Sequence, residues 1–353
     1  MQGGAGIGLF LLVATPIVWA VPVALMTAEL ASAIPEEGGY YVWVRDAMGP
    51  FPGFLCAWWS WVYSWLDTAL YPTLFFAYLH TLWQELALTS AGEANPWLKW
   101  AMGLPVIVPL TFLNIRGAKP TGRAAVVLGG ILLLPFLALC FIGLPAAISH
   151  PPTVLVAPGK TVSEALGAGI FVVMWNYLGF DSMSTVAGEV DRPRWAFPRA
   201  LLIAVPLVTA CYAVPVFVGV ANYPDLSKWN EGAWTSVARA IGGPWLAIAI
   251  TIAGALSAAG MFGADLLSAS RLPLVLAEDG LLPPALSRLS PKYGTPVAAI
   301  GISALLCTVL SFESFTKLLE VDVVMYSAAL ILEFVALVVL RWKRPDQIGR
   351  AHV

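Results

Sequence analysis

Four carboxylates stand inside long apolar runs of the sequence, at Asp67, Asp181, Asp265 and Glu333. No Lys or Arg stands in the middle of any of these runs. A charge at the centre of a bilayer costs about 2.5–3.5 kcal/mol even on lenient scales. Acids without basic partners are therefore either protonated or exposed to water where they await a cation, and both states indicate a cation or proton pathway. The alternative is that each is a neutral acid bonded to a neighbouring helix.

The most informative polar cluster lies within residues 171–185, which read FVVMWNYLGFDSMST. Polar, aromatic and glycine residues here interrupt an otherwise apolar run. Gly179 permits backbone conformations that other residues resist, and Asp181, Ser182 and Ser184 are residue types that cap a restarted helix. The pattern predicts a discontinuous helix whose free backbone groups bind substrate or ions near the middle of a membrane. The alternative is a continuous helix whose polar face packs on its neighbours.

The elements that would position these residues are long apolar stretches, and a helix needs about 20 mostly apolar residues to cross a bilayer. Breaker residues such as Pro and Gly separate the stretches. The sequence therefore predicts an all-α, multi-pass integral membrane protein. The nine candidate spans are residues 7–33, 54–82, 98–114, 121–148, 165–188, 196–221, 244–270, 296–311 and 321–340.

The composition supports this class and excludes others. Of 353 residues, 59% are hydrophobic and only 11% are charged, whereas soluble domains carry about 25% charged residues. The net charge of −2 argues against a nucleic-acid partner. The four cysteines lie in apolar runs without a CxxC or Cys/His cluster, so we expect neither a metal site nor a cofactor.

The loop charges predict the orientation of the chain in the membrane, and the last residues indicate where the native sequence ends. Lys and Arg gather in alternate connectors, which predicts an outer amino end and a cytoplasmic carboxyl end. Residues 348–353 (IGRAHV) match the translation of a common sequencing adapter, so we expect a non-native tail over residues 347–353. A natural polar tail is the alternative.

Three motifs together resemble the amino acid–polyamine–organocation superfamily of permeases. They are residues 22–39 (PVALMTAELASAIPEEGG), 175–193 (WNYLGFDSMSTVAGEVDRP) and 268–283 (SASRLPLVLAEDGLLP). They resemble that family's second span and acidic turn, its broken sixth span, and the cytoplasmic end of its eighth span. Residues 61–72 (WVYSWLDTALYP) and 331–335 (ILEFV) are similar to its polyamine-uptake branch.

The resemblance implies the inverted-repeat transporter fold, a bundle of five plus five helices that holds its substrate between the broken first and sixth spans. The nine candidate spans correspond to family spans two to ten, so we expect the first and the last two spans to be absent. We expect one transmembrane permease domain over residues 1–346.

The resemblance also implies a secondary active transporter in the cell membrane, not an enzyme. It would move amino acids or polyamines by alternating access and couple their movement to protons. A neutral amino acid exchanger of the same superfamily is one alternative. A cation channel is another, although the sequence has no repeated filter.

The expected partners are a small-molecule substrate, protons and the lipid bilayer. We expect Asp181, Asp265 and Glu333 to take part in proton or cation coupling. The residues expected to bind substrate are Asp67, Trp175, Asn176, Tyr177, Gly179, Asp181 and Ser182.

Overall fold

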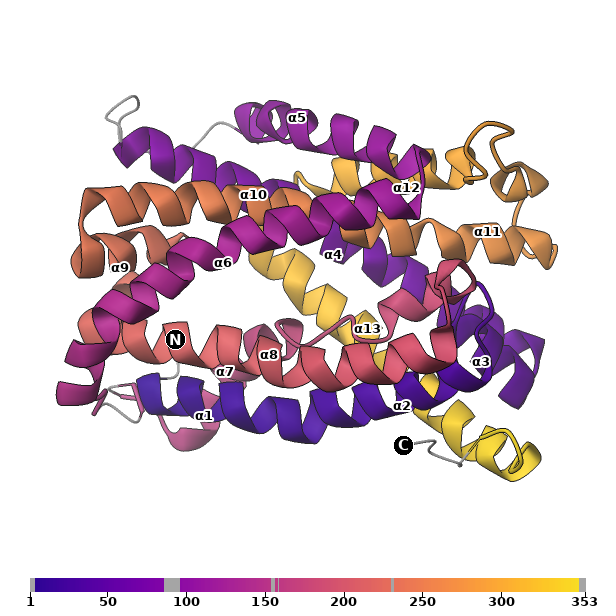
Figure 1. The fold of residues 1–353 in the computed structure, drawn as a ribbon, viewed down its shortest axis with the longest axis horizontal. Helices are drawn as coiled ribbons and strands as arrows, with labels where there is room; N and C mark the ends of the chain where they lie inside the picture. The colour runs from indigo at the N-terminus through magenta and orange to yellow at the C-terminus, as the bar shows by residue number, and fades with distance from the viewer. Residues whose placement is uncertain (1–3, 86–95, 154–155, 158, 230–231, 349–353) are drawn as a thin grey trace.

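The computed structural model describes residues 4–85, 96–153, 156–157, 159–229 and 232–348. Every regular element in these ranges is a helix. Several helices lie side by side along the long axis of the molecule, while α4 (Pro50–Glu85), α6 (Ala118–Ser149) and α13 (Phe315–Lys343) cross it obliquely (Figure 1). Residues 349–353 of the expected tail lie outside the described residues.

The first apolar range forms one rod in three pieces. These are α1 (Ala5–Thr15), the π-helical turn η1 (Pro16–Ala20) and α2 (Val21–Ala33). Proline has no N–H and its ring crowds the preceding turn, which accounts for the wider turn that begins at Pro16. The rod ends before a glycine turn that leads into the short helix α3 (Tyr40–Met48).

The remaining elements follow in chain order. They are α4 (Pro50–Glu85), α5 (Pro96–Ile115), α7 (Val162–Trp175), η2 (Ser182–Glu189), α8 (Pro193–Asn222), η3 (Leu226–Lys228), α9 (Ala233–Gly242), α10 (Pro244–Ala269), α11 (Arg271–Glu278), η4 (Pro284–Ser287) and α12 (Val297–Leu310).

Each of the nine predicted ranges coincides with helical structure. Five helical segments are long and apolar enough to cross a membrane, and they are Ala5–Ala33, Ala118–Ser149, Pro193–Asn222, Pro244–Glu278 and Phe315–Lys343. Three shorter apolar helices and the 36-residue, Trp-rich α4 account for the other ranges. The chain is a multi-pass, all-α membrane protein, as predicted.

The centre of the bundle is formed by α4, α10 and α13. Helix α4 packs along both α10 and α13, and α10 also packs along α6. Each of the three central helices carries a carboxylate part way along its length, Asp67 on α4, Asp265 on α10 and Asp322 on α13. The packing of these three helices therefore determines where the acids meet.

Candidate functional site

A cavity of about 480 Å³ lies among the central helices and the end of α7. Its walls are mostly apolar side chains of α4, α6, α8 and α10. Among the described residues that line it, three are acids and none is Lys, Arg or His. The polar and aromatic lining includes Tyr63, Asp67, Tyr71, Trp175, Asn176, Gly179, Ser182, Asp265 and Asp322.

Asp67 is held in place by two aromatic donors. The Trp175 Nε1–H donates to Asp67 Oδ1 at 2.9 Å, and the Tyr71 hydroxyl donates to Oδ2 at 3.2 Å. The two rings stack with their centroids 6.5 Å apart. The Asp265 carboxyl lies beside that of Asp67, and its Oδ2 has no hydrogen-bond partner among the described residues. The two adjacent carboxylates repel each other unless a proton or a cation lies between them.

Asp322 is a cavity residue that the sequence analysis missed. The predicted span began at residue 321, which placed this acid at the membrane surface, whereas α13 begins at Phe315 and carries Asp322 two turns inward. Its side chain is fully buried, and neither carboxyl oxygen has a hydrogen-bond partner in the described part of the chain. The sequence could have revealed Asp322 only if the helix had been predicted to begin at Phe315, because the acid would then lie seven residues inside it.

The predicted break after α7 is confirmed. The last i→i−4 hydrogen bond joins the Asn176 N–H to Val172 O, and the next two amides reach back only three residues. Gly179 then takes a φ of +82°, in the left-handed region that favours glycine. The segment that follows is the 3-10 helix η2, not the α-helix expected through residue 188.

The capping that we expected at the restarted helix is absent from this segment. Asp181 occupies the N-cap position of η2 but accepts no capping hydrogen bond there. Its side chain turns instead towards α13, where the Tyr326 hydroxyl donates to Asp181 Oδ1 at 2.5 Å.

Asp181 and Glu333 form a second acid pair, away from the cavity. Neither lines the cavity, and both side chains are buried next to each other with one unpartnered oxygen each among the described atoms. Tyr63 connects the two regions. Its hydroxyl lies 3.4 Å from Ser182 Oγ at the cavity wall, and its ring packs edge-on against Tyr326, with the centroids 5.1 Å apart.

Tyr177 also points away from the cavity. Its hydroxyl donates to Leu12 O on α1 at 2.7 Å, and its ring packs against Tyr212. The structure therefore brings Asp67, Trp175, Asn176, Gly179, Ser182 and Asp265 to one cavity, but not Tyr177, Asp181 or Glu333. For Tyr177 and Asp181 the reason is the break, because beyond Trp175 the spacing of residues no longer indicates a helix face. Glu333 lies on the unbroken helix α13, about three turns beyond the cavity residue Asp322.

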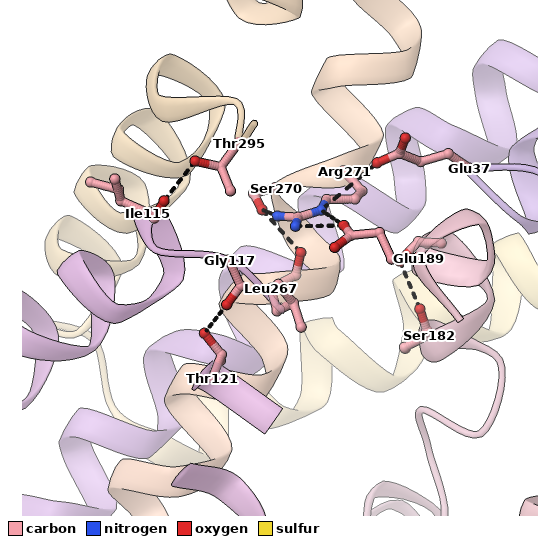
Figure 2. Close-up of polar contacts among 11 residues, drawn as sticks. Glu37, Ile115, Gly117, Thr121, Ser182, Glu189, Leu267, Ser270, Arg271 and Thr295 are labelled. Atoms are coloured by element: carbon pink, nitrogen blue, oxygen red, sulfur yellow. Dashed lines mark hydrogen bonds and ion pairs between the residues drawn. The ribbon is translucent and has the colours of Figure 1, made fainter. Parts of the chain in front are cut away.

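An ion-pair cluster fixes the segment beyond the break at the end of the bundle that loop charges assign to the cytoplasm. The Arg271 guanidinium, only 1% exposed, donates to Glu189 Oε1 from Nη2 at 2.7 Å and from Nε at 3.0 Å. Figure 2 shows these bonds, the bond from Nη1 to Ser270 Oγ, and Glu37 on the other side, 3.9 Å from Nε. The cluster joins α11, η2 and the turn after α2.

The glycine turn after α2 fits closely against η2. The Gly38 N–H donates to Thr185 O at 3.0 Å. A Cβ added to Gly39 would lie 2.2 Å from Ser184 Oγ, so a larger residue cannot occupy that position without displacing η2. Burial raises the pKa of the Glu37 carboxyl in the same turn, Arg271 opposes the rise, and Glu189 and Glu278 add to it.

Comparison with known proteins identifies the chain's relatives. A probable polyamine transporter of Arabidopsis thaliana is 38% identical over 331 residues, which are 94% of this chain and 64% of the relative. The polyamine transporter PUT1 of Oryza sativa subsp. japonica is also 38% identical, over 94% of this chain and 60% of its own length. The serine/threonine exchanger SteT of Bacillus subtilis is 26% identical over 93% of this chain and 74% of its own length.

The chain thus spans less than two thirds of the length of the two plant relatives. The model of the amino acid permease family matches residues 1–352, almost the whole chain. This match agrees with the resemblance of the three sequence motifs, and the chain belongs to the amino acid permease family.

Proposed function

We propose that the protein is a secondary active transporter of the cell membrane that moves polyamines or amino acids, with polyamines the favoured class. The observation that carries the proposal is the charge of the cavity. Asp67, Asp265 and Asp322 line it, and no described lining residue is basic. Buried acids without basic partners are costly in a membrane unless they serve a cation or proton, and a polyamine supplies several ammonium groups at once.

The walls beside Asp67 suit an ammonium group. The stacked rings of Trp175 and Tyr71 face the cavity next to the carboxylate, and a cation over an aromatic face gains about 0.5–2 kcal/mol. Asn176 and Ser182 add neutral hydrogen-bonding groups. The apolar remainder of the wall fits the methylene chain between the ammonium groups of a polyamine.

The break after α7 supports movement by alternating access. Broken helices in transporters place the substrate between two bodies that rock about it. Here α7 borders the cavity at its last residue, Trp175. Helix η2, on the other side of the break, is held to α11 by the ion pair of Glu189 with Arg271. The unwound residues around Gly179 would absorb the motion between these two parts.

Protons are the proposed coupling ion. Asp181 and Glu333 are buried together without a base among the described residues, and Tyr63 and Ser182 link them to the cavity wall. Asp265 lies beside Asp67 in the cavity itself. Substrate binding at Asp67 would displace a proton shared with Asp265, and the Asp181–Glu333 pair would receive or release one.

Uptake measurements test the proposal. Cells that express the gene should accumulate labelled putrescine and spermidine faster than control cells, and a proton gradient should increase the rate. Asp181→Asn keeps the size of the side chain, so it should leave the protein in the membrane but remove the dependence on the gradient. Uptake of neutral amino acids without polyamine uptake would favour an exchanger of the same family and overturn the polyamine proposal.

A further inference from the structure

We propose that Asp322 binds a third ammonium group of the substrate, so that the cavity prefers triamines to diamines. This inference rests on the proposed function, since it assumes that the cavity takes polyamines. It goes further by giving one residue a role in choosing between them.

The state of the Asp322 side chain is the first observation. The residue is 0% exposed, it lines the cavity, and both of its carboxyl oxygens lack a hydrogen-bond partner among the described residues. Buried carboxylates are normally paired or hydrogen-bonded, because an unsatisfied charge in an apolar site is strongly unfavourable. A fully unpartnered acid in the wall of a cavity is a place for a cationic group that arrives from outside.

The division of the three acids is the second observation. Asp67 and Asp265 lie side by side, and Asp67 is already oriented by Trp175 and Tyr71. Asp322 stands on a different helix, α13, and is hydrogen-bonded to neither. The cavity therefore offers a pair of adjacent carboxylates and a third carboxylate on another helix, close enough to both to interact with them electrostatically.

Charge balance gives the preference. A triamine carries three ammonium groups and matches the three carboxylates. A diamine that occupies the pair of adjacent carboxylates leaves Asp322 without a counter-charge, so that acid must bind a proton instead. An amino acid brings a carboxylate of its own, and a third acid repels it. Specificity of this kind comes from the penalty imposed on the wrong ligand as much as from attraction to the right one.

Uptake of two labelled substrates separates Asp322 from the paired acids. In the parental protein spermidine should have a lower KM than putrescine. Asp322→Asn should raise the KM for spermidine about tenfold or more, the loss expected for one charge-assisted contact, and leave putrescine within about twofold. Glu320→Gln, two residues earlier on the exposed side of α13, is the matched control and should change neither value.

Retained putrescine uptake shows in the same experiment that the Asp322→Asn protein is folded. Asp322→Glu, which keeps the charge, should restore the preference for spermidine. Thermal stabilisation of the purified protein in nanodiscs by spermidine and by putrescine gives a second reading that needs no transport.

The outcomes distinguish the inference from the proposed function. If the parental protein neither binds nor takes up any polyamine, the proposed function fails and the inference fails with it. If it takes up both polyamines but shows no preference for spermidine, only the inference is overturned. The inference alone is also overturned if Asp322→Asn reduces the uptake of both substrates equally, or reduces the uptake of neither.

Discussion

The acids at the end of the bundle that loop charges assign to the cytoplasm, called the cytoplasmic end below, and the acids of the cavity are arranged in opposite ways. At the cytoplasmic end, carboxylates from distant parts of the chain each meet a guanidinium. These pairs are Glu189 with Arg271, Glu29 with Arg341, Asp46 with Arg344, and Asp279 with Arg45. In the cavity, Asp67, Asp265 and Asp322 meet no base among the lining residues that the structure describes.

The difference teaches what each set of acids does. A paired carboxylate has its charge satisfied in the resting molecule, so its contribution is to hold α2, α3, α11, α13 and η2 together. An unpaired carboxylate in the membrane interior is unfavourable until a cation or proton arrives, so its contribution appears only in the presence of a ligand. Substitutions in the first set should therefore reduce stability, and substitutions in the second should reduce transport of those substrates whose ammonium groups the acid binds.

Arg271 is the place where the comparison predicts the largest loss of stability. Arg271→Met removes the partner of Glu189 and the positive charge that separates it from Glu37. Breaking a fully buried ion pair typically costs about 3–5 kcal/mol, and the loss here should be smaller because 36% of the Glu189 side chain is exposed to solvent. Thermal unfolding of the purified protein in nanodiscs should show a clear fall in Tm. Arg194→Met, at an exposed position near the start of α8, should melt like the parental protein.

A double substitution sharpens the test of Arg271. Adding Glu189→Gln to Arg271→Met removes the orphaned charge, so the double variant should recover part of the lost stability. If Arg271→Met melts at the parental temperature, or if adding Glu189→Gln lowers the melting temperature further, the ion pair does not hold η2 in place.

Asp67 is the place where the comparison predicts loss of transport without loss of stability. Removing one partner of a buried charge contact costs about 2–5 kcal/mol of binding, so Asp67→Asn should reduce polyamine uptake by about 30-fold or more. The empty protein should be no less stable, because the repulsion between Asp67 and Asp265 is relieved. If the Asp67→Asn protein transports at the parental rate but melts at a lower temperature, Asp67 stabilises the fold and does not bind substrate.

Local sequence signals predicted the helices and the break, but not what lies across the bundle from each residue. Apolar length located all nine helical ranges, and the polar cluster with Gly179 located the end of α7. The orientation of Tyr177 and Asp181 could not be predicted, since helical spacing has no meaning beyond a break. Asp322 was missed because the apolar run that revealed α13 begins only at its second turn.

The ion pairs of the cytoplasmic end were beyond the reach of sequence reasoning for a related reason. Arg271 and Glu189 are 82 positions apart, and Arg341 and Glu29 are 312 apart. No local periodicity relates such residues, and only the packing of the helices brings them together. The sequence did single out the SASRLP stretch, which contains Arg271, and the PEEGG stretch, which contains Glu37. It did not indicate that the two stretches contact each other.

Trp175 offers a smaller test, because it orients an acid rather than being one. Trp175→Phe keeps an aromatic face but removes the Nε1–H that donates to Asp67. A hydrogen bond to a charged group contributes about 1.5–3 kcal/mol, so we expect a roughly tenfold rise in KM for putrescine, less than the effect of Asp67→Asn. Trp195→Phe, at an exposed position on α8, is the control. An unchanged KM in Trp175→Phe would mean that Asp67 does not need this donor for binding.

The smallest effect is expected at Glu37, the one acid of the cytoplasmic cluster that is only loosely paired. Its Oε1 is 3.9 Å from Arg271 Nε, and 38% of the side chain is exposed. Burial raises its pKa above the ordinary 4.5 in spite of Arg271. The folded protein therefore binds this proton more tightly than the unfolded chain, so Glu37 makes stability fall as the pH rises from 4.5 through the raised pKa.

Glu37→Gln should remove that part of the fall, which makes the variant relatively more stable at neutral pH than in acid. Melting curves of both proteins in nanodiscs between about pH 4 and pH 8 would measure the difference, with Glu36→Gln at the exposed neighbouring position as the control for charge alone. A Glu37→Gln protein that is less stable than the parental protein at neutral pH would show that Glu37 is a full partner of Arg271, and the contrast between paired and unpaired acids would then extend to this turn as well.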